Sequence, residues 1–148
     1  MKNKTQKIAI ISMFLAMVFV SVSGKASEKE AVREVVQSAY VDGFQNLGGR
    51  NAMEKGFHPD FVMVLNRSGE LSDLPLERMI EITEQRSNNP EYQHVEVKAR
   101  FLDIDITGNA AMVKIELFRD GEKLFTDYLG LYKFDDGWKI FNKLYHQH

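Results

Sequence analysis

Three turn signals in the last third of the chain constrain its fold more than any other feature. They are Gly108-Asn109, Asp120-Gly121 and Asp135-Asp136-Gly137. Short loops of this composition join antiparallel strands, and the runs between them alternate in polarity as strands do. This part of the chain therefore predicts four consecutive strands, and the loop lengths fix which residues pair.

The predicted register divides this sheet into an apolar face and a charged face. Two-residue loops pair Asp103 with Lys114 and Lys114 with Asp127. A three-residue loop at 135–137 then leaves Lys143 diagonal to Asp127. Opposite charges paired across strands contribute roughly 0.2–1 kcal/mol each, so we interpret the row as structural rather than catalytic. A slip of one residue would exchange the two faces.

Each predicted face has its own composition. The apolar face is expected to hold no carboxylate and no lysine, and it includes Ile104, Val113, Ile115, Leu117, Thr126, Tyr128, Trp138, Ile140, Asn142 and His146. The charged face also carries Met112, Phe125, Leu129, Leu131, Phe141 and Tyr145. Exposed apolar side chains in such number usually mark an interface, so the charged face predicts a homodimer.

The N-terminal segment 1–26 has the layout of a secretory signal peptide. Three lysines precede an apolar run over residues 8–22, which ends in the small residues of Ser23-Gly24-Lys25-Ala26. The run is shorter than the ~20 residues of a spanning helix, although an uncleaved membrane anchor remains the alternative. We expect cleavage after Gly24 or Ala26, export to the periplasm or the medium, and no membrane contact afterwards.

Residues 27–148 are expected to form a single domain that folds without disulfides, because the chain contains no cysteine. Removing residues 1–26 takes away four lysines and no acid, which leaves 15 basic and 21 acidic side chains and a net charge of −6. Nucleic acid is a poor partner for that charge, since phosphate binding needs clustered Lys and Arg.

The first half of this domain predicts helices and one strand. Apolar residues at helical spacing indicate a helix from Ser27 to Leu47, a short one over 52–57 and a third from Pro75 to Gln85. A strand is expected over 61–65. Helices followed by an antiparallel sheet make an α+β fold, and a bulge near Arg100 would bend the strand that opens the last third.

The order of these elements resembles the nuclear-transport-factor-two-like superfamily. Within it, the chain is most similar to small exported proteins of the Putative lumazine-binding family. The resemblance lies in Phe57-His58-Pro59-Asp60, Asp127-Tyr128-Leu129 and the run from Gly137 to Lys143. It implies a cone-shaped half-barrel, with N-terminal helices packed on a strongly bent, mainly antiparallel sheet. It also implies a pocket between the apolar face and the first helix, in a superfamily that hosts isomerases, dehydratases and non-catalytic binders.

The residues predicted to line this pocket are aromatic groups with a few polar tips. They are Thr126, Tyr128, Asn142 and His146 from the sheet and Tyr40, Phe44, Phe57 and Met79 from the helices. Such a wall suits an unknown small molecule that is flat and mostly apolar. The first hypothesis is therefore a small-molecule binder, and a dimeric interaction module with a filled core is an alternative.

Catalysis finds less support in the sequence. A carbon-acid isomerase or dehydratase of the ketosteroid-isomerase-like type needs a pocket carboxylate as base, and the predicted apolar face has none. We interpret Asp60 as a turn residue and His58 as an edge residue rather than as catalytic groups. The histidines lack ligand spacing for a metal, and no cofactor motif is present. A carboxylate inside the pocket would favour the enzyme over the binder.

Overall fold

The computed structural model describes residue 24 and residues 27–148. The predicted signal peptide and its cleavage site therefore lie outside the described residues, apart from Gly24. Within the described part of the chain, no helix combines the length and the apolar character needed to cross a membrane.

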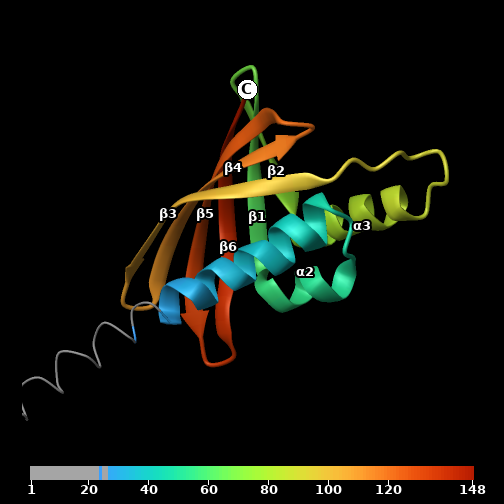
Figure 1. Cartoon of the computed structure of the whole chain (residues 1–148). Helices are drawn as coiled ribbons and strands as arrows, with labels where there is room; N and C mark the ends of the chain where they lie inside the picture. The colour runs from blue at the N-terminus through green and yellow to red at the C-terminus, as the bar shows by residue number, and fades with distance from the viewer. Residues whose placement is uncertain (1–23, 25–26) are drawn as a thin grey trace, which may run out of the picture.

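Among the described residues, the helices all end before residue 88. A helix spans residues 27–45, and its second half, η1 (Val36–Gln45), is a π-helix. The short α2 (Arg50–Gly56) and the longer α3 (Leu76–Ser87) follow. Figure 1 shows the first helix crossing one face of the sheet, with α2 and α3 beside its C-terminal end.

Six strands form one mixed sheet in the order β2-β1-β6-β5-β4-β3. Their bounds are β1 (Phe57–Arg67), β2 (Glu70–Pro75), β3 (Val97–Thr107), β4 (Ala110–Arg119), β5 (Glu122–Phe134) and β6 (Gly137–Gln147). β1 runs parallel to β6, and the other neighbours are antiparallel. The predicted α+β class is confirmed, and β2 is a strand that the sequence did not predict.

The sheet is not strongly curled, so the expected strongly bent half-barrel describes it only in part. The bulge predicted near Arg100 does occur, as a register shift between Phe101 and Asp103. Further shifts lie in the β1–β6, β4–β5 and β5–β6 pairs. Because a bulge bends its own strand locally, bending spread over four strand pairs does not gather into one sharp bend.

A bulge at Leu124 overturns the predicted pairing of β4 with β5. Arg119 pairs with Glu122 as expected, but the register then shifts and Leu117 pairs with Phe125. One extra residue in β5 turns every following side chain to the other face. Asp127 therefore lies opposite Ile115 and not opposite Lys114.

The β5–β6 hairpin departs from the predicted register twice. The two departures cancel in the half of the hairpin that lies away from the loop. The loop has two residues, so Phe134 pairs with Gly137 rather than with Trp138. A second bulge, at Phe141, then restores the predicted pairing of Tyr128 with Leu144. Trp138 and Ile140 consequently face inward as predicted, whereas Lys143 faces inward against the prediction.

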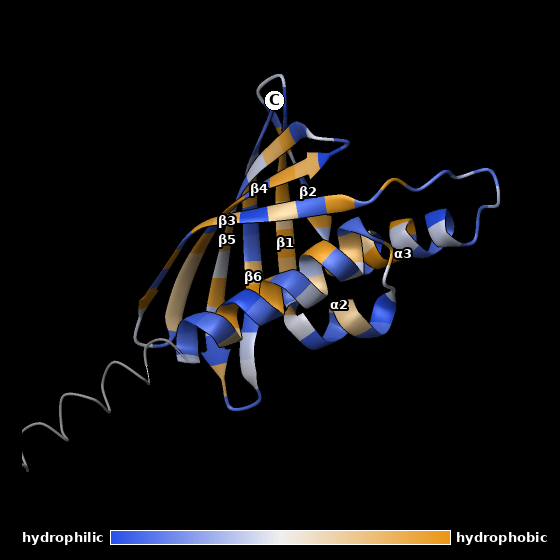
Figure 2. Ribbon diagram, in the orientation of Figure 1, coloured by the Kyte–Doolittle hydropathy of each residue, from blue (hydrophilic) through white to orange (hydrophobic). Residues whose placement is uncertain are grey.

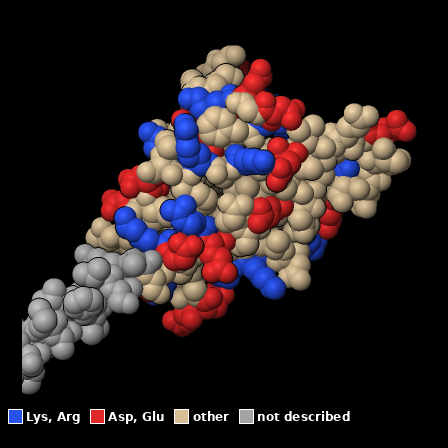
Figure 3. Space-filling model, viewed as in Figure 1, with Lys and Arg blue, Asp and Glu red and all other residues tan. Residues whose placement is uncertain are grey.

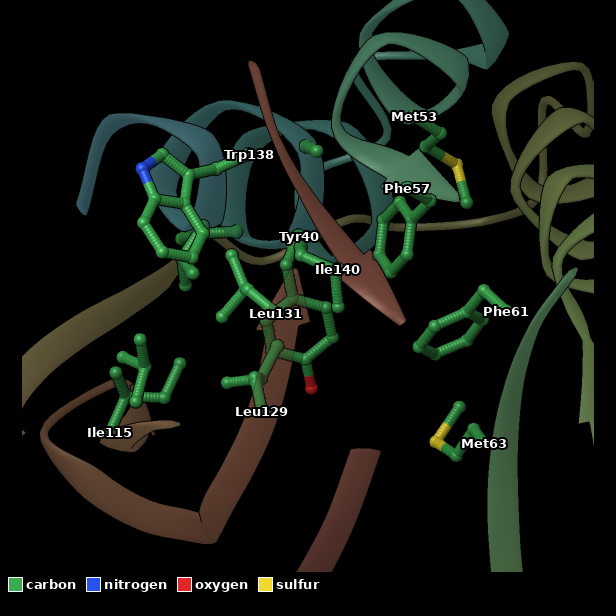
Figure 4. Packing of buried hydrophobic residues seen from close by; sticks show 14 of the residues in the cluster. Tyr40, Met53, Phe57, Phe61, Met63, Ile115, Leu129, Leu131, Trp138 and Ile140 are labelled. Carbon is green, nitrogen blue, oxygen red and sulfur yellow. The ribbon is translucent and has the colours of Figure 1, made fainter. Parts of the chain in front are cut away.

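The core fills the space between the helices and the inner face of the sheet. Figure 4 shows Tyr40 between the first helix and the strands, with Leu129 and Leu131 of β5 on one side and Phe57 on the other. Trp138 is 4% exposed, and its Nε1 donates to Glu28 Oε2 at 2.9 Å.

Figure 2 shows mainly hydrophilic residues on the side of the first helix that faces the viewer. Acidic and basic side chains are interspersed over the same view in Figure 3.

Candidate functional site

Asp127, Lys143 and Tyr40 meet inside the core and form the most unusual polar cluster of the described residues. The Tyr40 hydroxyl donates to Asp127 Oδ2 at 2.7 Å, and Lys143 Nζ lies 3.2 Å from Asp127 Oδ1. Asp127 and Tyr40 have no exposed surface, and Lys143 is 4% exposed. We call these three residues the buried triad.

Two consecutive strands hold the acid and the amine of the buried triad. The inner face of β5 carries Asp127 in a row with Phe125 and Leu129, and β6 brings Lys143 opposite Leu129. Both inward orientations follow from the bulges at Leu124 and Phe141 described above. The acid and the amine are thus placed together by register rather than by a local motif.

The π-helix supplies the third member of the triad. In a π-helix, hydrogen bonds join residues five apart, and such segments occur frequently at functional sites. Side chains five apart accordingly meet on η1: Gln45 Nε2 donates to the Tyr40 hydroxyl at 2.9 Å, and Gln37 Nε2 donates to Asp42 at 2.8 Å. Gln45 therefore positions the hydroxyl that binds Asp127.

Aromatic rings and a thioether surround the amine of Lys143. Its Nζ lies 4.3 Å from the ring centre of Tyr145, 5.3 Å from that of Tyr40 and 6.0 Å from that of Phe125. It also donates to the Met63 sulfur at 3.4 Å. These neighbours attract a cation weakly, so Asp127 is the one anionic partner that the described residues give this amine.

Burial shifts both members of the ion pair towards their neutral forms. It raises the pKa of Asp127, although Lys143 and the Tyr40 hydroxyl act in the opposite direction. Burial likewise lowers the pKa of Lys143, against the pull of Asp127. The pKa of Tyr40 is raised by burial first and by the nearby carboxylate second. Such a site offers a basic carboxylate, an amine that deprotonates easily and a phenol that stays protonated as a donor.

One atom of the buried triad has spare bonding capacity. Asp127 Oδ1 is buried and accepts no hydrogen bond from the described residues, because its contact with Lys143 lacks hydrogen-bond geometry. A buried polar atom without such a partner is uncommon and calls for an explanation. It is available to accept a proton.

The helical half of the predicted pocket lies where expected. Tyr40, Phe57 and Met79 are buried in the core, and Phe44 stacks on Tyr40 with ring centres 6.0 Å apart. Phe57 meets Tyr40 edge to face at 6.5 Å. Phe44 and Phe57 thus lie beside Tyr40 of the buried triad, and no bound ligand tests the binding role predicted for the four residues.

The sheet half of the predicted pocket lies on the opposite face, so that placement was wrong. Thr126, Tyr128, Asn142 and His146 point away from the helices, because the bulges put Asp127 and Lys143 inward in their stead. Tyr128 is 38% exposed.

The outward residues take part in other contacts. The Thr126 hydroxyl lies 2.8 Å from His148 Nε2. Asn142 and Gly130 border a shallow depression of about 290 Å³ with Phe141 and Tyr132. Tyr40 is not among the residues that line this depression.

The remaining sequence candidates take part in surface contacts. The Asp60 backbone N–H donates to His58 Nδ1 at 3.1 Å, and the His58 ring stacks on Phe134 at 4.9 Å. Among residue 24 and residues 27–148, no three His, Cys, Asp or Glu side chains are grouped so that they could hold a metal ion.

Sequence reasoning missed Asp127 and Lys143 as interior residues. The signal that could have placed them is the odd-numbered series Phe125, Leu129 and Leu131 in β5. These side chains are more apolar than the even-numbered Thr126 and Tyr128. Asp127 belongs to the same odd-numbered series, so its carboxylate lies on the inner face together with these apolar side chains.

The arrangement of helices and sheet defines the nuclear-transport-factor-two-like class. A solved protein of this class with unknown function, from Shewanella baltica, superposes with a TM-score of 0.67 at 25% identity, over 83% of this chain and 95% of its own. Another from Silicibacter pomeroyi gives a TM-score of 0.64 at 23% identity, over 86% and 98% of the two chains.

The sequence also identifies the family. The profile described as "Putative lumazine-binding" matches residues 27–146, so the chain belongs to that family, as its motifs predicted. A protein named aldolase FrzH, from a Cladobotryum species, is 30% identical over 124 residues, which cover 83% of this chain and 94% of that protein.

Proposed function

We propose that this protein is an enzyme that removes a proton next to the carbonyl group of a small, mostly apolar substrate. Asp127 is the general base, and the Tyr40 hydroxyl donates its one proton to Asp127 Oδ2 and so orients this carboxylate. The observation that carries this proposal is the buried Tyr40–Asp127 hydrogen bond of 2.7 Å beside the amine of Lys143.

The cost of the buried triad supports a chemical role. Removing two charges from water is expensive, and apolar residues of similar volume are often as stabilising as a buried ion pair, or more so. Asp127 and Lys143 are buried although most buried residues of the core are apolar. An acid with a raised pKa and an amine with a lowered pKa, held together inside an aromatic core, are typical of a reactive site.

The similarity to a protein named aldolase agrees with this chemistry. An aldol reaction begins with loss of a proton from the carbon next to a carbonyl, and this is the step that Asp127 would perform here. The proposal therefore covers aldol reactions and isomerisations alike, because both pass through an enol or enolate. The carboxylate of Asp127 was expected on the outer face of the sheet but is buried. A carboxylate inside the core supports an enzyme rather than a binder, because it can act as the base.

Substrate access would involve the half-buried residues around Lys143. Phe44, Phe125 and Tyr145 pack against the core without being fully enclosed. Met63 contacts Nζ directly, and its unbranched side chain adapts readily to new contacts. A flat apolar substrate that displaces Met63 would reach both the amine and Asp127.

Ligand binding without turnover is the second candidate, and the complete burial of Asp127 and Tyr40 favours it. In this case the triad only holds η1 against the sheet. Lumazine is the natural probe, given the name of the family. Under this alternative it would raise the melting temperature by mass action, while no ketone would lose an α-proton.

We also propose that the protein acts after export, as the N-terminal segment predicts, and as a homodimer. The outer face of the sheet carries the dimer contact in this proposal. Its exposed apolar residues include Met112, Tyr128, Tyr132, Phe141 and Leu144. Met112 and Phe141 were expected on this face. Tyr128, Tyr132 and Leu144 were not, and they lie there because the bulges exchanged the faces of β5 and of half of β6.

The test of the proposed enzyme is exchange of α-protons for deuterium. Cyclohexanone and indanone are incubated with the protein in D2O and followed by NMR. We expect exchange with the wild type and a loss of roughly 10²–10⁴-fold in Asp127→Asn, the usual contribution of a general base. Asp103→Asn, at an exposed carboxylate of β3, is the matched control. Equal rates in the wild type and Asp127→Asn, or no exchange by the wild type, would contradict the proposal.

A further inference from the structure

We propose that Lys143 is a covalent catalyst, whose amine forms a Schiff base with the aldehyde or ketone carbon of the substrate. This inference rests on the proposed function and goes beyond it, because a general base alone needs no lysine. It also narrows the substrate class to aldehydes and ketones, since esters and amides do not condense with an amine in this way.

The surroundings of Lys143 are those of a nucleophilic lysine. A lysine amine becomes reactive when an apolar pocket removes it from water. The side chain of Lys143 is 5% exposed, and its Nζ is bordered by the Met63 sulfur and the rings of Tyr145 and Tyr40. No other lysine of the described residues is classed as buried.

Asp127 supplies the proton acceptor that activation requires. The carboxylate oxygen Oδ1 lies 3.2 Å from Nζ and accepts no hydrogen bond from the described residues. Transfer of one proton from the ammonium to this oxygen gives a neutral amine beside a neutral acid. Burial favours that form, since it lowers the pKa of Lys143 and raises the pKa of Asp127.

The condensation balances with these groups alone. The lone pair of Nζ forms a bond to the carbonyl carbon, and the displaced π pair goes to the oxygen, which takes one proton from the nitrogen. Loss of this hydroxyl together with the second nitrogen proton releases one water and leaves the imine. The protonated acid of Asp127 then protonates the imine nitrogen to an iminium ion, and its carboxylate is free to remove the α-proton. Water reverses the sequence and restores the amine.

The position of Tyr40 fits the same sequence. Its hydroxyl donates to Oδ2, the oxygen of Asp127 that does not face the amine. Asp127 therefore has one oxygen held by the phenol and one directed at Nζ. The carboxylate stays oriented while Oδ1 exchanges protons with the amine and the substrate.

The test is reductive trapping of the imine on the intact protein. The wild type is incubated with cyclohexanone and cyanoborohydride, digested, and mapped by mass spectrometry. We expect the reduced adduct on Lys143 in preference to the surface lysines, because each unit by which the pKa falls leaves about tenfold more neutral amine at neutral pH. Lys139, four residues before Lys143 on β6, is the internal reference; its side chain is 15% exposed and pairs with Asp136 at 3.0 Å.

Lys143→Arg is the matched variant, because it keeps the positive charge and cannot form an imine. It should lose the adduct at this site and also lose α-proton exchange, while its circular dichroism spectrum remains that of the wild type. The peptide map of the wild type by itself shows whether the adduct is on Lys143, so the test does not depend on how well the variant folds.

The outcomes separate this inference from the proposed function. Exchange that depends on Asp127 without an adduct on Lys143 would overturn the covalent step and leave the general base in place. Labelling spread evenly over the surface lysines would overturn it as well. An adduct on Lys143 without exchange would support the Schiff base and remove Asp127 as the base, and the absence of both would refute both.

Discussion

Replacing Lys143 with methionine tests whether the buried triad is an electrostatic unit. Methionine keeps the unbranched stem among the rings of Tyr145 and Tyr40 but removes the one cation that the described residues place beside Asp127. Because Asp127 has no exposed surface, its charge cannot recover solvation by water. Removing one partner of such a pair costs about 3–5 kcal/mol, which is a large share of the 5–15 kcal/mol that stabilises a typical domain.

Thermal unfolding followed by circular dichroism measures this loss. For a domain of this size, 1 kcal/mol corresponds to about 4 °C in Tm, so the expected decrease is roughly 12–20 °C near neutral pH. The decrease should also depend on pH. Without the amine, the pKa of Asp127 rises further above its unfolded value of 3.8.

The sign of the pH dependence follows from this raised pKa. A carboxyl group whose pKa is higher in the folded state contributes stability that is fully present below the unfolded pKa. That stability is lost as the pH rises through the folded pKa. Lys143→Met should therefore lie closest to the wild type near pH 4 and fall behind it as the pH increases. A penalty below 1 kcal/mol, or one that is constant with pH, would refute the electrostatic account.

A double variant separates stability from function. Asp127→Leu combined with Lys143→Met removes both charges, and the expected stability equals or exceeds that of the wild type, because well-packed apolar residues often replace a buried pair without loss. The same variant should have no α-proton exchange. A double variant that is less stable than either single one would indicate that the pair is kept for the fold.

Three further predictions concern the surroundings of the triad. Trp138→Ala should destabilise the domain by about 3–5 kcal/mol, as for other large core aromatics. A loss below 1 kcal/mol in chemical denaturation would contradict the burial of Trp138. Gly56→Ala should cost about 1–3 kcal/mol by overpacking, because the new Cβ would lie 2.3 Å from Ala39 Cβ; an unchanged denaturation midpoint would contradict that contact. Leu144→Glu, at a side chain that is 59% exposed on the outer face, should convert the proposed dimer to a monomer in sedimentation experiments, and a wild type that sediments as a monomer would end the dimer proposal.

The turns and the element types could be predicted because their signals are local. Gly108-Asn109 and Asp120-Gly121 form the hairpin loops expected of them, and both glycines have positive φ, 60° and 83°. Apolar periodicity likewise gave the three helices with ends close to those observed. Each of these features depends on a few neighbouring residues, which the sequence displays directly.

The faces of the sheet could not be predicted, because one extra residue decides them. Counting from Asp120-Gly121 gives the correct pairs until Leu124, where the bulge moves Asp127 to the interior. The odd-numbered series of β5 is the more apolar one, but the even-numbered series also contains Leu124 and Tyr128, so this contrast is a weak signal beside the register counted from the turn. The inward position is stabilised by Lys143 from the next strand and by Tyr40 from the distant first helix.

β2 was missed for a related reason. Its residues Glu70–Pro75 are mostly exposed, and the strand forms by pairing with β1. Val62 lies opposite Pro75 at one end of this pairing, and Arg67 lies opposite Glu70 at the other. Its own sequence lacks the apolar alternation that marks a half-buried strand. Edge strands of this kind depend on a partner rather than on their own composition.

The most direct measurement of the central claim is an NMR titration of the two charged groups in the folded protein. The Lys143 side chain is followed through carbon-13 at Cε and assigned by its absence in Lys143→Arg, and the Asp127 carboxyl carbon is followed in parallel. The account predicts that Lys143 titrates below its ordinary value of 10.5 and Asp127 above its ordinary value of 3.8. Titration of both groups at their ordinary values would mean that they are solvated, and it would contradict the buried acid–base site.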